Sequence, residues 1–161
     1  AWMTGHLSTD FKAQGKVILN GNDLTNTPHH RRNIGILFQD PLLFPHMSVG
    51  QNIAFGLHER GDRQAAIKLA LEEVDLGGFE DRDPATLSGG QKARVALMRA
   101  LVAKPKALLL DEPFSKLDSV LRDSVRSLVF ERARERRIPT VLVTHDESDA
   151  IAAGGPVIRL D

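Results

Sequence analysis

Short apolar runs alternate along this chain with longer segments whose apolar residues recur at helical spacing. The runs predict strands at residues 15–21, 33–38, 107–111, 140–144 and 157–160. The first of them ends in an Asn-Gly turn signal. Residues 107–110 contain only Ala and Leu, which is typical of a parallel strand that is buried on both faces.

Capping residues mark where the predicted helices begin. Residues 1–5 have the composition of the end of an amphipathic helix, and the later helices start near Ser48, Asp62, Ser88, Ser115 and Asp146. The second of these later helices ends at the glycines 77–78, and the third ends at about residue 103, before a proline. The fourth is long, running to about residue 137, and Val120 belongs to its apolar stripe.

Strands that alternate with helices predict an α/β fold. Residues 1–45 and 104–161 carry the strands, whereas residues 46–103 contain only helical signals apart from loops. We therefore predict one domain over residues 1–161, with an α/β core and an inserted helical subdomain.

Composition excludes several classes of function. The 161 residues are 42% hydrophobic and 26% charged, and 21 basic side chains balance 21 acidic ones, so no overall field attracts nucleic acid. The chain has no cysteine, which excludes disulfides and thiolate metal sites. No apolar run reaches the roughly 18–20 residues of a membrane helix, so we expect no direct membrane insertion.

The sequence LSGGQ at residues 87–91 lies at the start of a predicted helix. The Ser88 hydroxyl and the free N–H groups of the first turn form an anion site that the helix dipole reinforces. Gly89 and Gly90 allow a ligand to approach the backbone closely. A serine cap before a flexible turn is the alternative for Ser-Gly-Gly alone, but the full five residues favour the anion site.

Polar side chains follow three of the predicted strands. Asp111 and Glu112 come after the strand at 107–110, Gln39 follows the strand at 33–38, and His145 follows the strand at 140–144. Ligands bind at the carboxyl ends of parallel strands. One carboxylate there can hold Mg²⁺ through water, and the next can activate water as a general base. An Asp-Glu-Pro sequence taken alone is more often a capped turn.

Taken together, these motifs resemble the ABC-transporter ATPase family over nearly the whole chain. The correspondences are the Q-loop glutamine Gln39, the signature at residues 87–91, the Walker B pair Asp111 and Glu112, the D-loop at residues 115–118 and the H-loop histidine His145. The resemblance implies a P-loop NTPase-like (RecA-like) parallel sheet. Residues 37–57 further resemble the import-type subunits of bacteria, which serve small solutes such as polyamines, thiamine, sulfate or iron.

The resemblance also implies roles for the residues at the strand ends. Asp111 would organise Mg²⁺, and Glu112 would be the base that activates water. His145 would contact the γ-phosphate of ATP, and Gln39 would sense Mg²⁺, through water, and the attacking water.

Other residues would serve a second copy of the subunit. Ser88, Gly89, Gly90 and Gln91 would bind the ATP held by the opposite subunit of a homodimer, with Asp118 at that interface. Transmembrane permease subunits would be the other partners. The protein would then be cytoplasmic and peripheral to the inner face of the cell membrane.

The family also uses a phosphate-binding loop, Gly-x-x-x-x-Gly-Lys-Ser/Thr. The one candidate, at Gly15 and Lys16, fails because Asp10 and Val17 occupy required positions. The resemblance therefore implies a truncated domain without the phosphate-loop strand, which would lie beside the strand at 107–110. We expect weak or no binding of ATP and Mg²⁺ and no meaningful hydrolysis by this chain alone. We also expect an oligomer through exposed sheet edges.

Three functions stay open. The first is the ATPase subunit of a membrane importer, and the second is a non-catalytic oligomerising module derived from such a subunit. The third is a soluble ABC-type ATPase that acts on nucleic acid or ribosomes. Residues 39–55 favour the first over the third, because in importers this region forms the docking surface for the permease. The third would normally bring long insertions or a second ATPase domain.

Overall fold

The computed structural model describes residues 14–58 and 61–159, so the helix expected at residues 1–5 lies outside the described residues. The strands are β1 (Ile18–Leu19), β2 (Asn22–Asp23), β3 (Ile34–Leu37), β4 (Ala107–Asp111) and β5 (Thr140–Val143). The α-helices are α1 (Val49–Gly56), α2 (Arg63–Glu72), α3 (Gly89–Val102), α4 (Ser119–Glu135) and α5 (Glu147–Ala153), and short 3-10 turns occupy His29–Arg31 and Pro84–Thr86.

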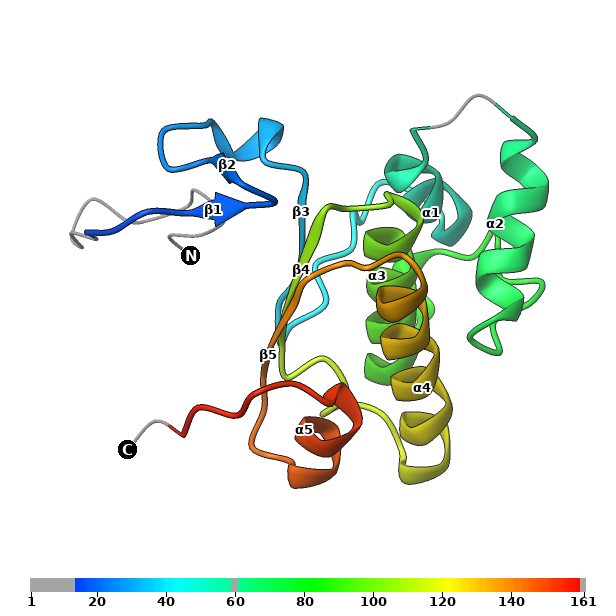
Figure 1. The fold of residues 1–161 in the computed structure, drawn as a ribbon. Helices are drawn as coiled ribbons and strands as arrows, with labels where there is room; N and C mark the ends of the chain where they lie inside the picture. The colour runs from blue at the N-terminus through cyan, green and yellow to red at the C-terminus, as the bar shows by residue number, and fades with distance from the viewer. Residues whose placement is uncertain (1–13, 59–60, 160–161) are drawn as a thin grey trace.

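A parallel sheet with the strand order β3-β4-β5 forms the centre of the fold, and α3, α4 and α5 lie on one side of it (Figure 1). The register places Leu110 opposite Leu37 on one side and opposite Leu142 on the other. This confirms the predicted α/β fold with a parallel sheet. The helices α1, α2 and α3 lie between β3 and β4 in the chain, and the division into a core and a subdomain stays a prediction.

The helix starts are set by local side-chain caps. Ser48 and Ser88 each form a capping box with the glutamine three residues later, and Asp62 and Asp146 accept hydrogen bonds from the first turns of α2 and α5. Where α1 crosses α3, a Cβ on Gly56 would stand 2.3 Å from the carbonyl oxygen of Arg99. Only glycine permits this approach of the two backbones.

The long helix begins later than the sequence predicts. Residues 115–118 are not helical, and α4 starts at Ser119 because the Asp118 carboxylate accepts a hydrogen bond from the backbone N–H of Leu121 at 3.0 Å. The shift changes which side chains face the core. Val120 was predicted on the apolar stripe but is 83% exposed, whereas Leu117, which precedes the helix, is buried.

Two strand predictions were wrong in extent. The chain reverses at Asn20 and Gly21, whose φ angles are 50° and 78°, so the strand expected at 15–21 is the first arm of the small β1–β2 hairpin. The strand expected at 157–160 is absent from its described residues, 157–159. Val157 and Ile158 are 65% and 83% exposed, and no described strand pairs with them.

The position expected for a phosphate-loop strand, beside β4, was also wrong. Both sides of β4 are already paired, with β3 and with β5, so the open edges of the described sheet belong to those two strands. One face of the sheet is buried through Leu108 and Leu110, while Val141 and Val143 on the other face are 46% and 55% exposed. On β4 itself, Ala107 and Leu109 are only partly buried on that other face, so the predicted full burial of this strand holds for one face only.

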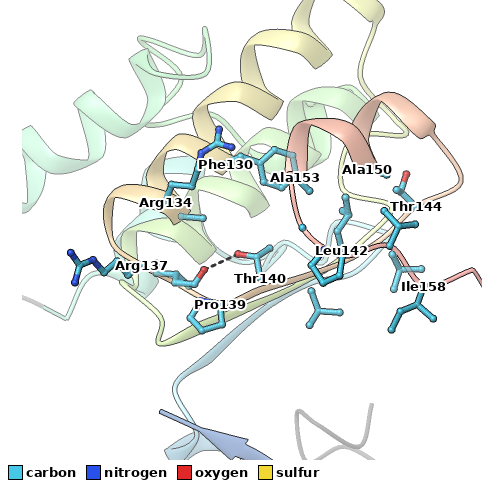
Figure 2. Close-up of a pocket in the computed structure, with 17 residues that line it drawn as sticks. Phe130, Arg134, Arg137, Pro139, Thr140, Leu142, Thr144, Ala150, Ala153 and Ile158 are labelled. Carbon is cyan, nitrogen blue, oxygen red and sulfur yellow. Dashed lines mark hydrogen bonds between the residues drawn. The ribbon is translucent and has the colours of Figure 1, made fainter.

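A groove of about 850 Å³ lies at the β5 edge, between α4, β5, α5 and residues 155–158 (Figure 2). Its lining is largely apolar, with Phe130, Leu142 and Ala153 among its walls. No helix in the described part of the chain is long and apolar enough to cross a membrane.

Candidate functional site

The carboxyl ends of β3, β4 and β5 meet at one edge of the sheet, because the three strands are parallel and in register. Gln39, Asp111 and His145 are all exposed there, and Glu112 is partly buried. The sequence placed these four residues at strand ends, and the structure brings the strand ends together.

Glu112 and His145 are in direct contact. One carboxylate oxygen of Glu112, Oε1, accepts a hydrogen bond from the backbone N–H of His145 at 2.9 Å and lies 2.7 Å from its ring Nδ1. The Glu112 side chain is 15% exposed, whereas that of His145 is 83% exposed. Glu112 also has a φ of 46°, a left-handed conformation that is uncommon for a non-glycine residue and concentrates at functional sites. The carboxylate is thus held in a fixed orientation by the loop after β5.

The signature forms a capped helix N-terminus, as predicted. The Ser88 Oγ accepts a hydrogen bond from the backbone N–H of Gln91 at 3.2 Å, and the Gln91 side-chain oxygen accepts one from the Ser88 N–H at 2.9 Å. The side chain of Gln91 is therefore occupied by the capping box. A Cβ on Gly90 would stand 3.0 Å from the Lys116 carbonyl oxygen, so this glycine also permits the D-loop to pack against the helix.

The D-loop touches several motifs. Its Ser115 hydroxyl donates to the Glu112 carbonyl oxygen at 2.9 Å, and its Lys116 ammonium forms an ion pair with Asp40, the residue after Gln39. Asp118 ends the loop and caps α4. The D-loop thus lies between the signature and the strand ends. Among the described residues no hydrogen bond joins the signature directly to Glu112 or His145.

The donor chemistry at the strand ends fits a hard cation with mostly external ligands. The described residues contain no cluster of three or more His, Cys, Asp or Glu side chains that could enclose a metal ion. Mg²⁺ commonly takes one or two protein oxygens and completes its shell with water and phosphate oxygens. The exposed carboxylate of Asp111 and the amide of Gln39 can supply such oxygens.

A set of charged contacts behind residues 144–146, the His145 loop, was not predicted from the sequence. Arg122 donates to an Asp146 carboxylate oxygen at 3.0 Å, and Arg126 donates to Asp149 at 3.0 Å. Asp149 is only 3% exposed. The only sequence signal is two arginines one helical turn apart, a pattern that many solvated helices share.

Comparison with known proteins identifies what this arrangement is similar to. The sequence model of the family described as "ABC transporter" matches residues 2–115. The protein named uncharacterized ABC transporter ATP-binding protein YnjD, of Escherichia coli strain K12, is 52% identical over 94% of this chain and 71% of its own. The Fe(3+) ions import ATP-binding protein FbpC of Photorhabdus laumondii is 49% identical over 91% of this chain, which spans 43% of that relative.

The fold is similar to a solved structure as well. The ATP-binding cassette MJ0796, in a dimeric post-hydrolysis state bound to ADP and Pi, aligns with a TM-score of 0.76 and 28% sequence identity. The alignment covers 86% of this chain and 66% of that one. The described fold is therefore the P-loop NTPase-like α/β fold that the sequence predicted.

Proposed function

This chain belongs to the ABC transporter family, and from that premise we propose that it acts as the ATP-binding subunit of a bacterial importer of Fe³⁺. One observation carries the ATP-binding part of the proposal. A complete signature caps the N-terminus of α3, and its Gly90 lies against the D-loop. The solute is proposed from the relatives named as Fe(3+) ions import ATP-binding proteins.

In the proposed site, the residues at the strand ends prepare the attack of water. Glu112 takes the proton from the attacking water, and the two contacts from His145 keep its carboxylate in place. Asp111 and Gln39 would hold Mg²⁺ through water, and His145 would contact the terminal phosphate of ATP. ATP supplies the phosphoryl group that is transferred to water.

The signature is proposed to complete a nucleotide site of a second subunit. In a homodimer, the free N–H groups at the start of α3 face the phosphates that the opposite subunit holds, together with Ser88, Gly89, Gly90 and Gln91. Asp118 lies beside this contact at the end of the D-loop. The dimer of MJ0796 with ADP and Pi supports this assembly by analogy.

A permease is proposed to dock on the surface formed by residues 42–47 and α1. Leu42 and Phe55 are 63% and 60% exposed there, and the Phe44 and Phe55 rings are tilted against each other at 4.7 Å. The Arg99 guanidinium lies 4.8 Å from the centre of the Phe44 ring, and burial lowers the pKa of Arg99. Such docking would hold the protein at the inner face of the cell membrane.

A signature-donation assay tests the proposal. This chain is mixed with an ABC ATP-binding subunit that has a phosphate-binding loop and whose own signature serine has been replaced by arginine, and ATP hydrolysis is measured. We expect the chain to raise hydrolysis by roughly tenfold or more, because a missing transition-state donor typically costs about 100-fold or more. Ser88→Arg in this chain should abolish the gain, whereas Ser124→Arg, on the exposed surface of α4, should retain it. The absence of any gain would refute the proposal.

The chain alone is expected to hydrolyse no ATP above background. The 161 residues contain no phosphate-binding loop, and phosphoryl transfer depends on positioning and charge stabilisation of the phosphates. The measurement is phosphate release by the purified chain with Mg²⁺ and ATP. Hydrolysis at a rate typical of ABC ATPases that disappears in Glu112→Gln would contradict this expectation.

The open β5 edge favours a second candidate function, the oligomerising module. The strand carries no charge, and Val143 is 55% exposed on it. Such edges pair with other strands. We expect Val143→Lys to shift the chain toward smaller species in analytical ultracentrifugation, because a charge on the strand opposes edge pairing. Val120→Lys changes an equally apolar, exposed residue on a helix and should have no such effect. A wild-type chain that is monomeric throughout, or a Val143→Lys chain that associates unchanged, would exclude this candidate.

A further inference from the structure

One guanidinium contacts both loops that flank the candidate site. Arg122 lies in the first turn of α4, and its Nη1 donates to the Oδ2 of Asp146 at 3.0 Å. Its Nη2 donates to the carbonyl oxygen of Leu117, in the D-loop, at 3.2 Å. Asp146 belongs to the His145 loop, residues 144–146. A single side chain therefore joins the D-loop to the His145 loop.

Asp146 has further contacts besides the one with Arg122, and it is next to His145 in the chain. The Oδ1 of Asp146 accepts hydrogen bonds from the N–H of Ser148 at 2.8 Å and from its hydroxyl at 2.6 Å. The backbone N–H of Asp146 donates to the Thr144 hydroxyl at 3.0 Å. The residue is thus fixed by α5, by Thr144 and by Arg122. The neighbouring residue, His145, contacts the Glu112 carboxylate through both its backbone N–H and its ring Nδ1.

We propose that Arg122 is a positioning residue that transmits the position of the D-loop to the contact between His145 and Glu112. The proposal rests on the proposed function, in which the D-loop meets a second subunit and Glu112 activates water. A change at the subunit contact would then alter the orientation of the catalytic carboxylate through Leu117, Arg122 and Asp146.

The geometry is specific to arginine. The planar fork of a guanidinium presents two parallel donors to two acceptors, whereas the ammonium of lysine is a single point charge. The third donor of Arg122, Nε, is buried and has no partner within the described residues. The Arg122 side chain thus makes its two loop contacts in a position where its Nε donates no hydrogen bond to a described residue. The Ser148 hydrogen bonds, and to a lesser extent Arg122, lower the pKa of Asp146.

The arginine one turn further along α4 has a different role. Arg126 contacts Ser148 and Asp149 in α5 and Asp123 in its own helix. Its contacts within the described chain include no D-loop atom. Arg126 holds α5 against α4, and only Arg122 of this pair joins the two loops.

The ring signal of His145 in a ¹H–¹³C NMR spectrum tests the proposal on the chain itself, without nucleotide. The Glu112→Gln variant serves as a reference, because it gives the position of the His145 ring signal when the Glu112 carboxylate is absent. Arg122→Gln should move the signal most of the way toward that position. Arg134→Gln is the matched control, because the side chain of this exposed arginine of α4 makes one hydrogen bond within the described residues, to the Ala152 carbonyl at 3.4 Å. A folded Arg122→Gln chain with an unmoved His145 signal would overturn the proposal.

Transmission from the D-loop is tested with a second substitution. Asp118→Ala removes the cap at the end of the D-loop and should move the His145 signal in the wild-type background but not in Arg122→Gln. If Arg122→Gln does not fold, Arg122→Lys is used in its place. The lysine retains the positive charge beside Asp146 but loses the contact with the Leu117 carbonyl. In Arg122→Lys the His145 signal should stay near its wild-type position, and Asp118→Ala should no longer move it. An undiminished Asp118→Ala effect in either background would overturn the proposal. Because no nucleotide is present, the result is independent of the signature-donation assay.

Discussion

Replacing Asp149 with alanine is expected to lower the free energy of unfolding by about 3–5 kcal/mol, the usual cost of removing one partner from a buried ion pair. Asp149 is 3% exposed, and the Arg126 side chain opposite it is 14% exposed. The two are joined at 3.0 Å, and the Thr144 hydroxyl lies 3.4 Å from the other carboxylate oxygen. Alanine leaves the charge of Arg126 in a poorly solvated position without its buried partner, and the carboxylate that still pairs with it, Asp123, is 72% exposed.

Urea denaturation followed by circular dichroism measures this effect. Glu147→Ala is the matched control on the same helix, because its carboxylate is 86% exposed and its ion pair with Arg159 spans 3.6 Å. The control should change stability by no more than about 0.5 kcal/mol, as exposed pairs contribute little. If Asp149→Ala were as stable as the control, the pair between Arg126 and Asp149 would not be what holds α5 to α4.

Features governed by neighbouring residues were predictable from the sequence. Ser48, Asp62, Ser88 and Asp146 cap helices as predicted, because a cap requires only a short polar side chain before an apolar helical pattern. The strand ends that carry the four polar site residues were also predictable. A parallel sheet brings such ends together whatever lies between the strands.

Features that depend on distant partners were not predictable. The strand expected at 157–160 failed because an apolar run indicates a strand only where another strand can pair with it. The contact between Glu112 and His145 is consistent with the motif, but the φ of 46° at Glu112 has no sequence signal in a non-glycine residue. The roles of Arg122 and Arg126 depend on how α4 and α5 pack, which periodicity does not specify.

Asn52→Leu is the second substitution with a large expected effect, a loss of roughly 2–4 kcal/mol in the free energy of unfolding. Asn52 is fully buried in α1, and its Oδ1 accepts hydrogen bonds from the N–H of Phe44 at 2.9 Å and from Arg99 at 3.2 Å. Its amide nitrogen donates to the carbonyl oxygens of Phe44, Met47 and Ser48 at 3.0–3.2 Å. Leucine of similar size removes the side-chain partner of the Phe44 N–H and of the Met47 carbonyl, at about 1–3 kcal/mol for each that water cannot reach. The carbonyls of Phe44 and Ser48 keep their backbone hydrogen bonds.

The same substitution should loosen the proposed docking surface, because Asn52 and Arg99 together hold the loop at residues 42–47. Arg99 also donates to the Leu42 carbonyl at 2.5 Å. We expect faster hydrogen exchange at the Phe44 amide in Asn52→Leu. The urea midpoint of unfolding is measured on the same variant. Gln51→Glu is the control, since glutamate can replace glutamine in the capping box and both measurements should stay near wild type. A stable Asn52→Leu chain with an unchanged Phe44 amide would mean that Arg99 alone holds this loop, and Arg99→Gln would then be the variant that releases it.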